Sequence, residues 1–108
     1  MLKRNLLLLC SALVVIALTA SAQSDSKTLF VRNCSLCHGN DGRAQNAMGK
    51  ALKASDLTSQ TVQSKSDADL YTQIAKGKGK MAGYENILGK KGVEDMVKYV
   101  RTLKPTKH

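Results

Sequence analysis

The chain has 108 residues, which is enough for one domain and no more. It carries a formal net charge of +9 but holds only one Phe, three Tyr and no Trp. So few large apolar side chains exclude an extensive self-sufficient core, and small domains of this kind usually need a metal, a disulfide or another staple. The composition therefore predicts that something besides the chain fills the interior.

Residues 1–22 have the pattern of a secretory signal peptide. Two basic residues are followed by an almost unbroken apolar run over 6–20, and Ala-Ser-Ala then offers small residues for cleavage. The run is short for a membrane span, and no other segment could be one. An uncleaved N-terminal anchor is the alternative. We expect a periplasmic protein whose mature part, residues 23–108, has no membrane span and binds no nucleic acid.

The most informative motif is Cys-Ser-Leu-Cys-His, which begins at Cys34. A short helix over 27–33, with Phe30 as a core residue, is expected to lead directly into it. Two thiols three positions apart, followed at once by an imidazole, are the attachment signature of c-type haem. On a helical turn the sulfurs of Cys34 and Cys37 project to one side, where they can bond two vinyl groups at one porphyrin edge. His38 is then placed to ligate the iron, and one covalent haem c supplies the missing apolar volume.

Two other chemistries are open to the same motif. A bare Cys-x-x-Cys can form a disulfide or a redox pair, but a thioredoxin-like dithiol requires a βαβ setting, and no strand pattern flanks this one. A structural zinc site requires four ligands, and after export the terminal His108 is the only further Cys or His. We therefore favour haem over a disulfide or dithiol and over zinc, and both alternatives stay open.

The next part of the chain is predicted to be mostly loop. A polar, glycine-containing turn over 39–48 leaves the motif, and 58–65 is expected to be a polar connection at the surface. Leu52 is the expected pocket residue of this part and Leu57 its next apolar anchor, so we expect both to face the haem pocket.

Two helices are predicted in the second half. Ser66 and Asp69 have the arrangement of a capping box at the start of a helix that Gly77 ends. After a break over 89–92, apolar residues recur at helical spacing in a final helix over 93–103, which buries Val93, Met96, Val97, Val100 and Leu103.

The glycine-rich loop over 77–84 is predicted to supply the second iron ligand. The candidates after the initiator are Met48, Met81 and Met96. Met96 belongs to the apolar helix stripe, and Met48 is close to His38 in sequence, which makes the other haem face hard to reach. Met81 lies beyond a helix in the loop itself, so we expect it to be the ligand. Tyr84, at the end of the loop, is expected to line the pocket.

With these residues in place, the chain resembles the mono-haem class I cytochromes c, a family of small exported bacterial electron carriers. The resemblance runs from about residue 29 to 103. It implies an all-α fold of three to four short helices around one haem, with crossing terminal helices and with Phe30 and Tyr99 near the crossing. It also implies His38 as the proximal ligand and Met81 as the distal ligand. Family members usually have Pro after that Met, whereas this chain has Ala82, which loosens the loop.

The resulting hypothesis is a soluble, monomeric one-electron carrier and not an enzyme. The alternative is a haem enzyme or gas sensor whose distal site is open or whose Met81 is easily displaced. Lys76, Lys78 and Lys80 surround the ligand loop. They are either ordinary solvated lysines or a basic rim that attracts the acidic docking face of a redox partner.

Overall fold

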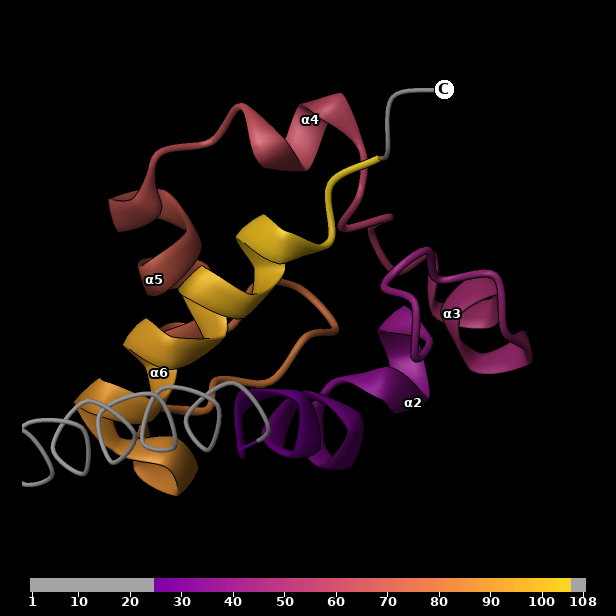
Figure 1. Cartoon of the computed structure of the whole chain (residues 1–108). Helices are drawn as coiled ribbons and strands as arrows, with labels where there is room; N and C mark the ends of the chain where they lie inside the picture. Colours follow the sequence, from indigo (N-terminus) through magenta and orange to yellow (C-terminus); the bar gives the residue numbers. More distant parts are fainter. Residues whose placement is uncertain (1–24, 106–108) are drawn as a thin grey trace, which may run out of the picture.

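The computed structural model describes residues 25–105, and within them the fold is all-α, as predicted. The first helix covers residues 25–33. Five labelled helices follow (Figure 1): α2 (Ser35–His38), α3 (Ala47–Leu52), α4 (Gln60–Gln63), α5 (Asp67–Lys76) and α6 (Glu85–Thr102). The described part of the chain contains no strand and only one isolated bridge, between Lys78 and Met81.

The first and last helices meet through a pair of aromatic rings. The centroids of Phe30 and Tyr99 lie 4.9 Å apart, with the ring planes inclined by 39°. Phe30 is 1% exposed, and Val93 and Met96 of α6 are equally buried. Such tilted ring pairs add stability beyond the apolar area they bury. The predicted contact of Phe30 with Tyr99 between the terminal helices is confirmed.

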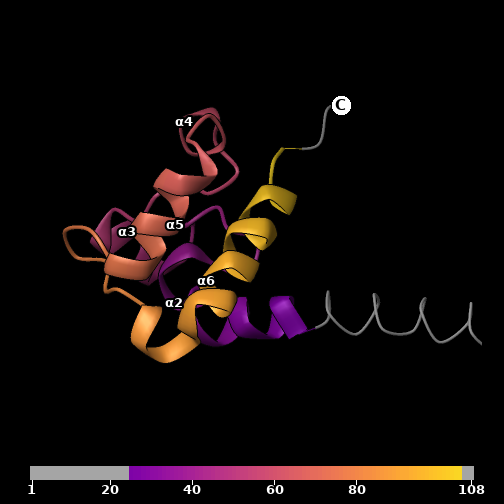
Figure 2. The same ribbon diagram turned by 90° about the vertical axis from the view of Figure 1, so that its left-hand side faces the viewer.

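Helices α5 and α6 lie side by side in both views and enclose the second part of the core (Figure 2). Leu70 of α5 packs with Val97 and Val100 of α6 and with Val62 of α4. The predicted stripe of α6 is buried at Val93, Met96, Val97 and Val100. Its 3.6-residue period therefore identified the correct face of the helix.

The expectation that residues 58–65 are only a polar surface connection was wrong. This segment contains α4, whose Val62 is in the core, and Thr58 is buried as well. The Ser59 hydroxyl begins the helix by accepting a hydrogen bond from the Val62 backbone N–H at 3.3 Å. A four-residue helix presents one inward side chain, which is too few for any periodicity to appear in the sequence.

Helix ends follow the predicted signals at α5 and differ at α6. The Ser66 hydroxyl accepts from the Asp69 N–H at 3.0 Å, and Gly77 ends α5 with φ +77°. The predicted break in α6 is present but confined to the non-helical Gly89 (φ +70°, ψ 172°), so one helical segment precedes this kink and the segment after it begins before Val93. Leu103, predicted to be buried in the final helix, is instead its C-terminal cap and is only partly buried.

A polar clamp connects α6 to the segment between α4 and α5. The Arg101 guanidinium donates to the carbonyl oxygens of Gln63 and Lys65 and to the Asp67 carboxylate. The Gln63 amide donates to the carbonyls of Leu57 and Val100 at 2.7 and 2.9 Å. These bonds hold the irregular chain around Leu57 in a fixed position beside α6.

The predicted signal peptide and its cleavage point lie outside the described residues. Within residues 25–105, none of the helices combines the length and apolar character that a membrane crossing requires.

Candidate functional site

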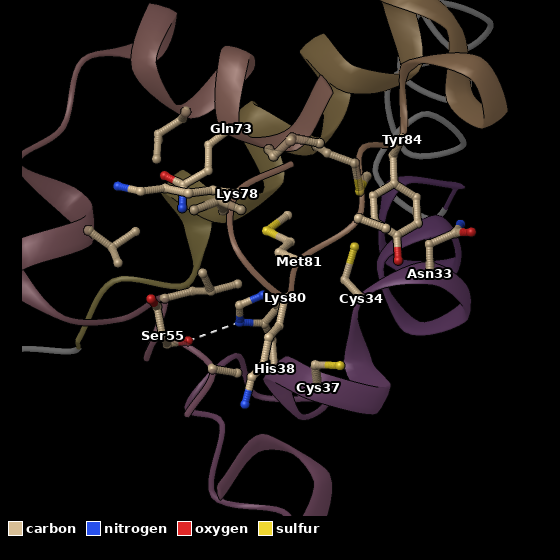
Figure 3. A pocket seen from close by; sticks show the side chains of 18 of the residues that line it. Asn33, Cys34, Cys37, His38, Ser55, Gln73, Lys78, Lys80, Met81 and Tyr84 are labelled. Carbon is tan, nitrogen blue, oxygen red and sulfur yellow. Dashed lines mark hydrogen bonds between the residues drawn. The ribbon is translucent and has the colours of Figure 1, made fainter. Parts of the chain in front are cut away.

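A cavity of about 550 Å³ lies among the helices of the described residues, a size typical of small-molecule and cofactor sites. Its walls come from the first helix, from each of α2 to α6 and from the loops between them (Figure 3). All of the site residues predicted from the sequence line it: Cys34, Cys37, His38, Leu52, Leu57, Met81 and Tyr84. Residues 50 positions apart in the chain are thereby brought to one cavity.

The two thiols reach the cavity because the chain continues as helical turns through the motif. The Cys34 N–H donates to the Phe30 carbonyl at 2.8 Å, and the His38 N–H donates to the Cys34 carbonyl at 2.9 Å. Both cysteines are free and half-buried. They lie on the same side of the cavity, as thioether bonds to one porphyrin edge require (Figure 3).

Burial raises the pKa of the Cys34 thiol to about 11, with a smaller contribution from the charge of Cys37. Cys34 is therefore a protonated thiol at neutral pH in the unmodified fold. A thioether forms when such an S–H adds across a vinyl C=C, which consumes the thiol proton and needs no further oxidant. The Cys34 sulfur is thus in the chemical state from which haem attachment proceeds.

His38 is oriented by a backbone carbonyl. Its Nδ1 lies 2.9 Å from the Ser55 oxygen, which is joined to it in Figure 3 by the dashed line. A carbonyl can only accept, so Nδ1 carries the hydrogen and Nε2 keeps a free lone pair for a metal. Such outer contacts fix the ring and increase its strength as a ligand. The sequence had no signal for Ser55, because a carbonyl belongs to every residue and this one is 17 positions from His38.

Helix α3 packs against α2 and holds the Cys-Ser-Leu-Cys-His motif in place. The Asn46 side chain caps α3 by accepting from the Gly49 N–H, and its amide donates to the Leu36 carbonyl at 2.7 Å. A Cβ on Gly49 would overlap the Cys37 carbonyl, so the two short helices are in close contact. Asn46 and Gly49 are positioning residues that sequence reasoning missed.

Met81 enters the cavity from the loop that follows α5. Lys78 and Met81 exchange backbone hydrogen bonds of 3.0 Å, and the Tyr84 N–H donates back to the Ile74 carbonyl of α5 at 2.9 Å. The loop is therefore a closed turn, and its Met81 side chain lines the same cavity as the His38 ring (Figure 3).

The other two methionines have different positions. Met48 is 42% exposed and does not line the cavity. Met96 lines the wall but is fixed in the buried stripe of α6. Met81 is consequently the methionine that lies on a loop and also enters the cavity.

The walls away from sulfur and imidazole are mostly apolar. Leu52 and Leu57 contribute as predicted. The sequence did not identify several further wall residues, which are Phe30, Val62, Leu70, Ile74, Met96 and Val100. Each was predicted as core or not at all, because helical periodicity separates buried from exposed faces and does not distinguish a core from a cofactor wall.

Tyr84 lies beside Cys34 (Figure 3). Burial raises the pKa of its phenol, and the charges of Cys34 and Cys37 raise it further. Its hydroxyl therefore stays protonated at neutral pH and can donate a hydrogen bond at the cavity wall.

The charged side chains that line the cavity are all basic. They are Lys53, Lys65, Lys78 and Lys80, and no Asp or Glu is among the lining residues. Lys76 of the expected rim does not line the cavity; it lies 3.9 Å from Glu85. Within the described residues, no three His, Cys, Asp or Glu side chains gather as a metal site of their own, so the zinc alternative has no support there.

Comparison with known proteins agrees with this geometry. A family model described as "Cytochrome C oxidase, cbb3-type, subunit III" matches residues 21–100. A solved structure, the KustC0563 c-type cytochrome, is similar with a TM-score of 0.68 and 28% sequence identity. That similarity covers 74% of this chain and 98% of the neighbour. No curated protein matches the chain.

Proposed function

The chain belongs to the family described as cytochrome c oxidase, cbb3-type, subunit III, and on this basis we propose that it is a periplasmic carrier of single electrons. The predicted relation to small c-type cytochromes is confirmed by this membership and by the solved neighbour. The finer proposal is one haem c with His38 and Met81 as its axial ligands. Residues 1–22 would direct export, and residues 23–108 would form the mature, monomeric domain.

One observation carries the proposal. A single cavity contains two thiols on one side, an imidazole whose Nε2 is free, and the Met81 thioether. The remaining wall is mostly apolar, and the cavity has the size of a cofactor site. When bound, haem supplies an iron that exchanges one electron between the ferric and ferrous states, and His/Met ligation favours a high potential.

The residues of the chain would then have separate tasks. Cys34 and Cys37 hold the cofactor covalently at one edge. His38, aligned by the Ser55 carbonyl, and Met81 would both ligate the iron and would leave no place for a substrate there. Leu52, Leu57 and the other apolar wall residues exclude water, which limits the rearrangement that accompanies electron exchange.

The residues that follow Met81 in its loop support an alternative function. Ala82 stands where related proteins usually have Pro, and both Ala82 and Gly83 are exposed. If Met81 leaves the iron readily, the distal position opens, and the chain would be a haem enzyme or gas sensor. The alternative therefore depends on how firmly the loop holds Met81.

The basic side chains suggest how a redox partner would be chosen. Lys53, Lys65, Lys78 and Lys80 surround the cavity without any nearby lining carboxylate. Such a field would attract a partner with an acidic docking face and accelerate encounter at low salt. Rate constants for an acidic partner should fall steeply with ionic strength, and a flat salt dependence would exclude steering.

The test is expression of the full chain in a host that attaches c-type haem. Mass spectrometry should show one haem on a chain that lacks residues 1–22, and a redox titration should fit one electron. Cys34→Ala/Cys37→Ala should lose covalent haem. A wild-type chain without covalent haem would refute the proposal and return the two cysteines to the disulfide or dithiol chemistry.

A further inference from the structure

We propose that Lys78, together with Gln73, binds a haem propionate and thereby ties the Met81 loop to the edge of the cofactor opposite Cys34 and Cys37. This inference rests on the proposed haem. It assigns a role to two residues that neither the sequence motif nor the axial ligands explain.

The structure of haem determines on which side of the cavity the propionates would lie. In haem the two vinyl groups and the two propionates are on opposite edges of the ring. Cys34 and Cys37 mark the vinyl edge, so the propionates must approach the wall across the cavity. Gln73 and Lys78 line the cavity and lie on that far side (Figure 3).

The negative charges of the propionates require compensating groups on the cavity wall. Two carboxylates entering a partly apolar cavity lose hydration and need compensating donors or charges. The ion pairs among the described residues use Lys76, Lys91 and Arg101 and leave the Lys78 ammonium uncommitted. Gln73 offers an N–H₂ donor beside it, so the far wall has one positive charge and one neutral donor.

Backbone hydrogen bonds fix the positions of Gln73 and Lys78 at the C-terminal end of α5. The Gly77 N–H donates to the Gln73 carbonyl at 2.9 Å, which places Lys78 immediately beyond the end of α5. Lys78 then exchanges two backbone bonds with Met81. A propionate held by Lys78 is therefore one rigid turn away from the iron ligand, and this contact compensates for Ala82 in a loop without proline.

The experiment compares three variants that each lose one positive charge. Lys78→Gln removes the proposed contact, Lys65→Gln removes another lysine that lines the cavity, and Lys90→Gln removes an exposed lysine that does not line it. The measurements on each holoprotein are the reduction potential, the propionate vibrations in resonance Raman spectra, and the far-red sulfur-to-iron band of the ferric form.

We expect Lys78→Gln to lower the potential more than either control, because an unpaired propionate favours ferric iron. Its propionate vibration should shift, and the weak far-red band of sulfur-to-iron bonding should diminish because a partly exposed ion pair no longer restrains the loop. Gln73→Leu should shift the same vibration, while Lys78→Arg should restore the wild-type values.

Equal behaviour of the three lysine variants would overturn the inference, as would a larger effect of Lys65→Gln. If Lys78→Gln yields no holoprotein, Gln73→Leu and Lys78→Arg decide the question, and an unshifted vibration in Gln73→Leu refutes it. A wild-type chain without covalent haem would refute the proposed function itself, which separates the two failures.

Discussion

Substitution of Gly77 by Ala tests whether the turn after α5 places Met81. Gly77 has φ +77° and ψ 174°, a region of backbone conformation that is essentially restricted to glycine. A Cβ at this position would also overlap the Met81 carbonyl oxygen and lie 2.7 Å from the Ala82 carbonyl carbon. The substitution therefore combines backbone strain with a collision inside the ligand loop.

Gly89 is a matched control for the strain alone. Its φ of +70° and ψ of 172° are nearly those of Gly77, but a Cβ there meets nothing within 4 Å. Strain in this region costs about 1–3 kcal/mol. Alanine also lowers the conformational entropy of the unfolded chain, which stabilises the folded state by about 0.4–1 kcal/mol. We therefore expect Gly89→Ala to lower the free energy of unfolding by about 1–2 kcal/mol.

Gly77→Ala has the same strain and an added overlap, which costs about 1–3 kcal/mol in packed surroundings. The expected loss is about 2–5 kcal/mol, measured by guanidinium unfolding of the holoprotein. The weak far-red band of sulfur-to-iron bonding should diminish in Gly77→Ala and persist in Gly89→Ala. Equal losses for the two variants, with the band intact in both, would refute the role assigned to this turn.

Three further predictions concern the core, the clamp and the pH dependence. Phe30→Ala should lower the free energy of unfolding by about 3–5 kcal/mol in denaturant, because the ring is fully buried against Tyr99. Val31→Ala, at a 40% exposed position, is the control and should change this free energy by no more than about 0.5 kcal/mol. Arg101→Gln should cost about 2 kcal/mol by the same assay, since it leaves half-buried carbonyls without their charged donor; an unchanged midpoint would show that the clamp is dispensable. The folded state raises the pKa of Tyr84 above its ordinary value of 10.0, so stability is full below that pH and falls as pH rises beyond it; a Tyr84→Phe chain whose alkaline stability loss is as large as that of wild type would contradict this.

Local chemistry in the sequence was enough to predict much of the fold. Ser66 and Gly77 mark the two ends of α5 because capping and positive φ depend on residue type at single positions. The stripe of α6 was predicted because its burial repeats over several turns. Helix α4 was missed because one buried Val62 in a polar segment has no period.

In the site, the roles of side chains were predictable from the sequence, and the role of a backbone group was not. Cys34, Cys37 and His38 are recognisable because thiols and imidazoles have few other uses at that spacing. Met81 was predicted from the glycines around it, and the structure brings it to the cavity. The carbonyl of Ser55 was beyond prediction, because the backbone path that carries it to His38 is set by the packing of the whole domain.

The most direct test of the central claim is the absorption spectrum of the holoprotein in both oxidation states, with and without carbon monoxide, beside Met81→Ala. Ligation by His38 and Met81 predicts a low-spin ferrous c-type spectrum for the wild type, a far-red sulfur band in the ferric form, and no response to carbon monoxide. Met81→Ala should lose the band and bind the gas. A high-spin wild type that already responds to carbon monoxide would contradict the electron-carrier proposal and establish an open distal site.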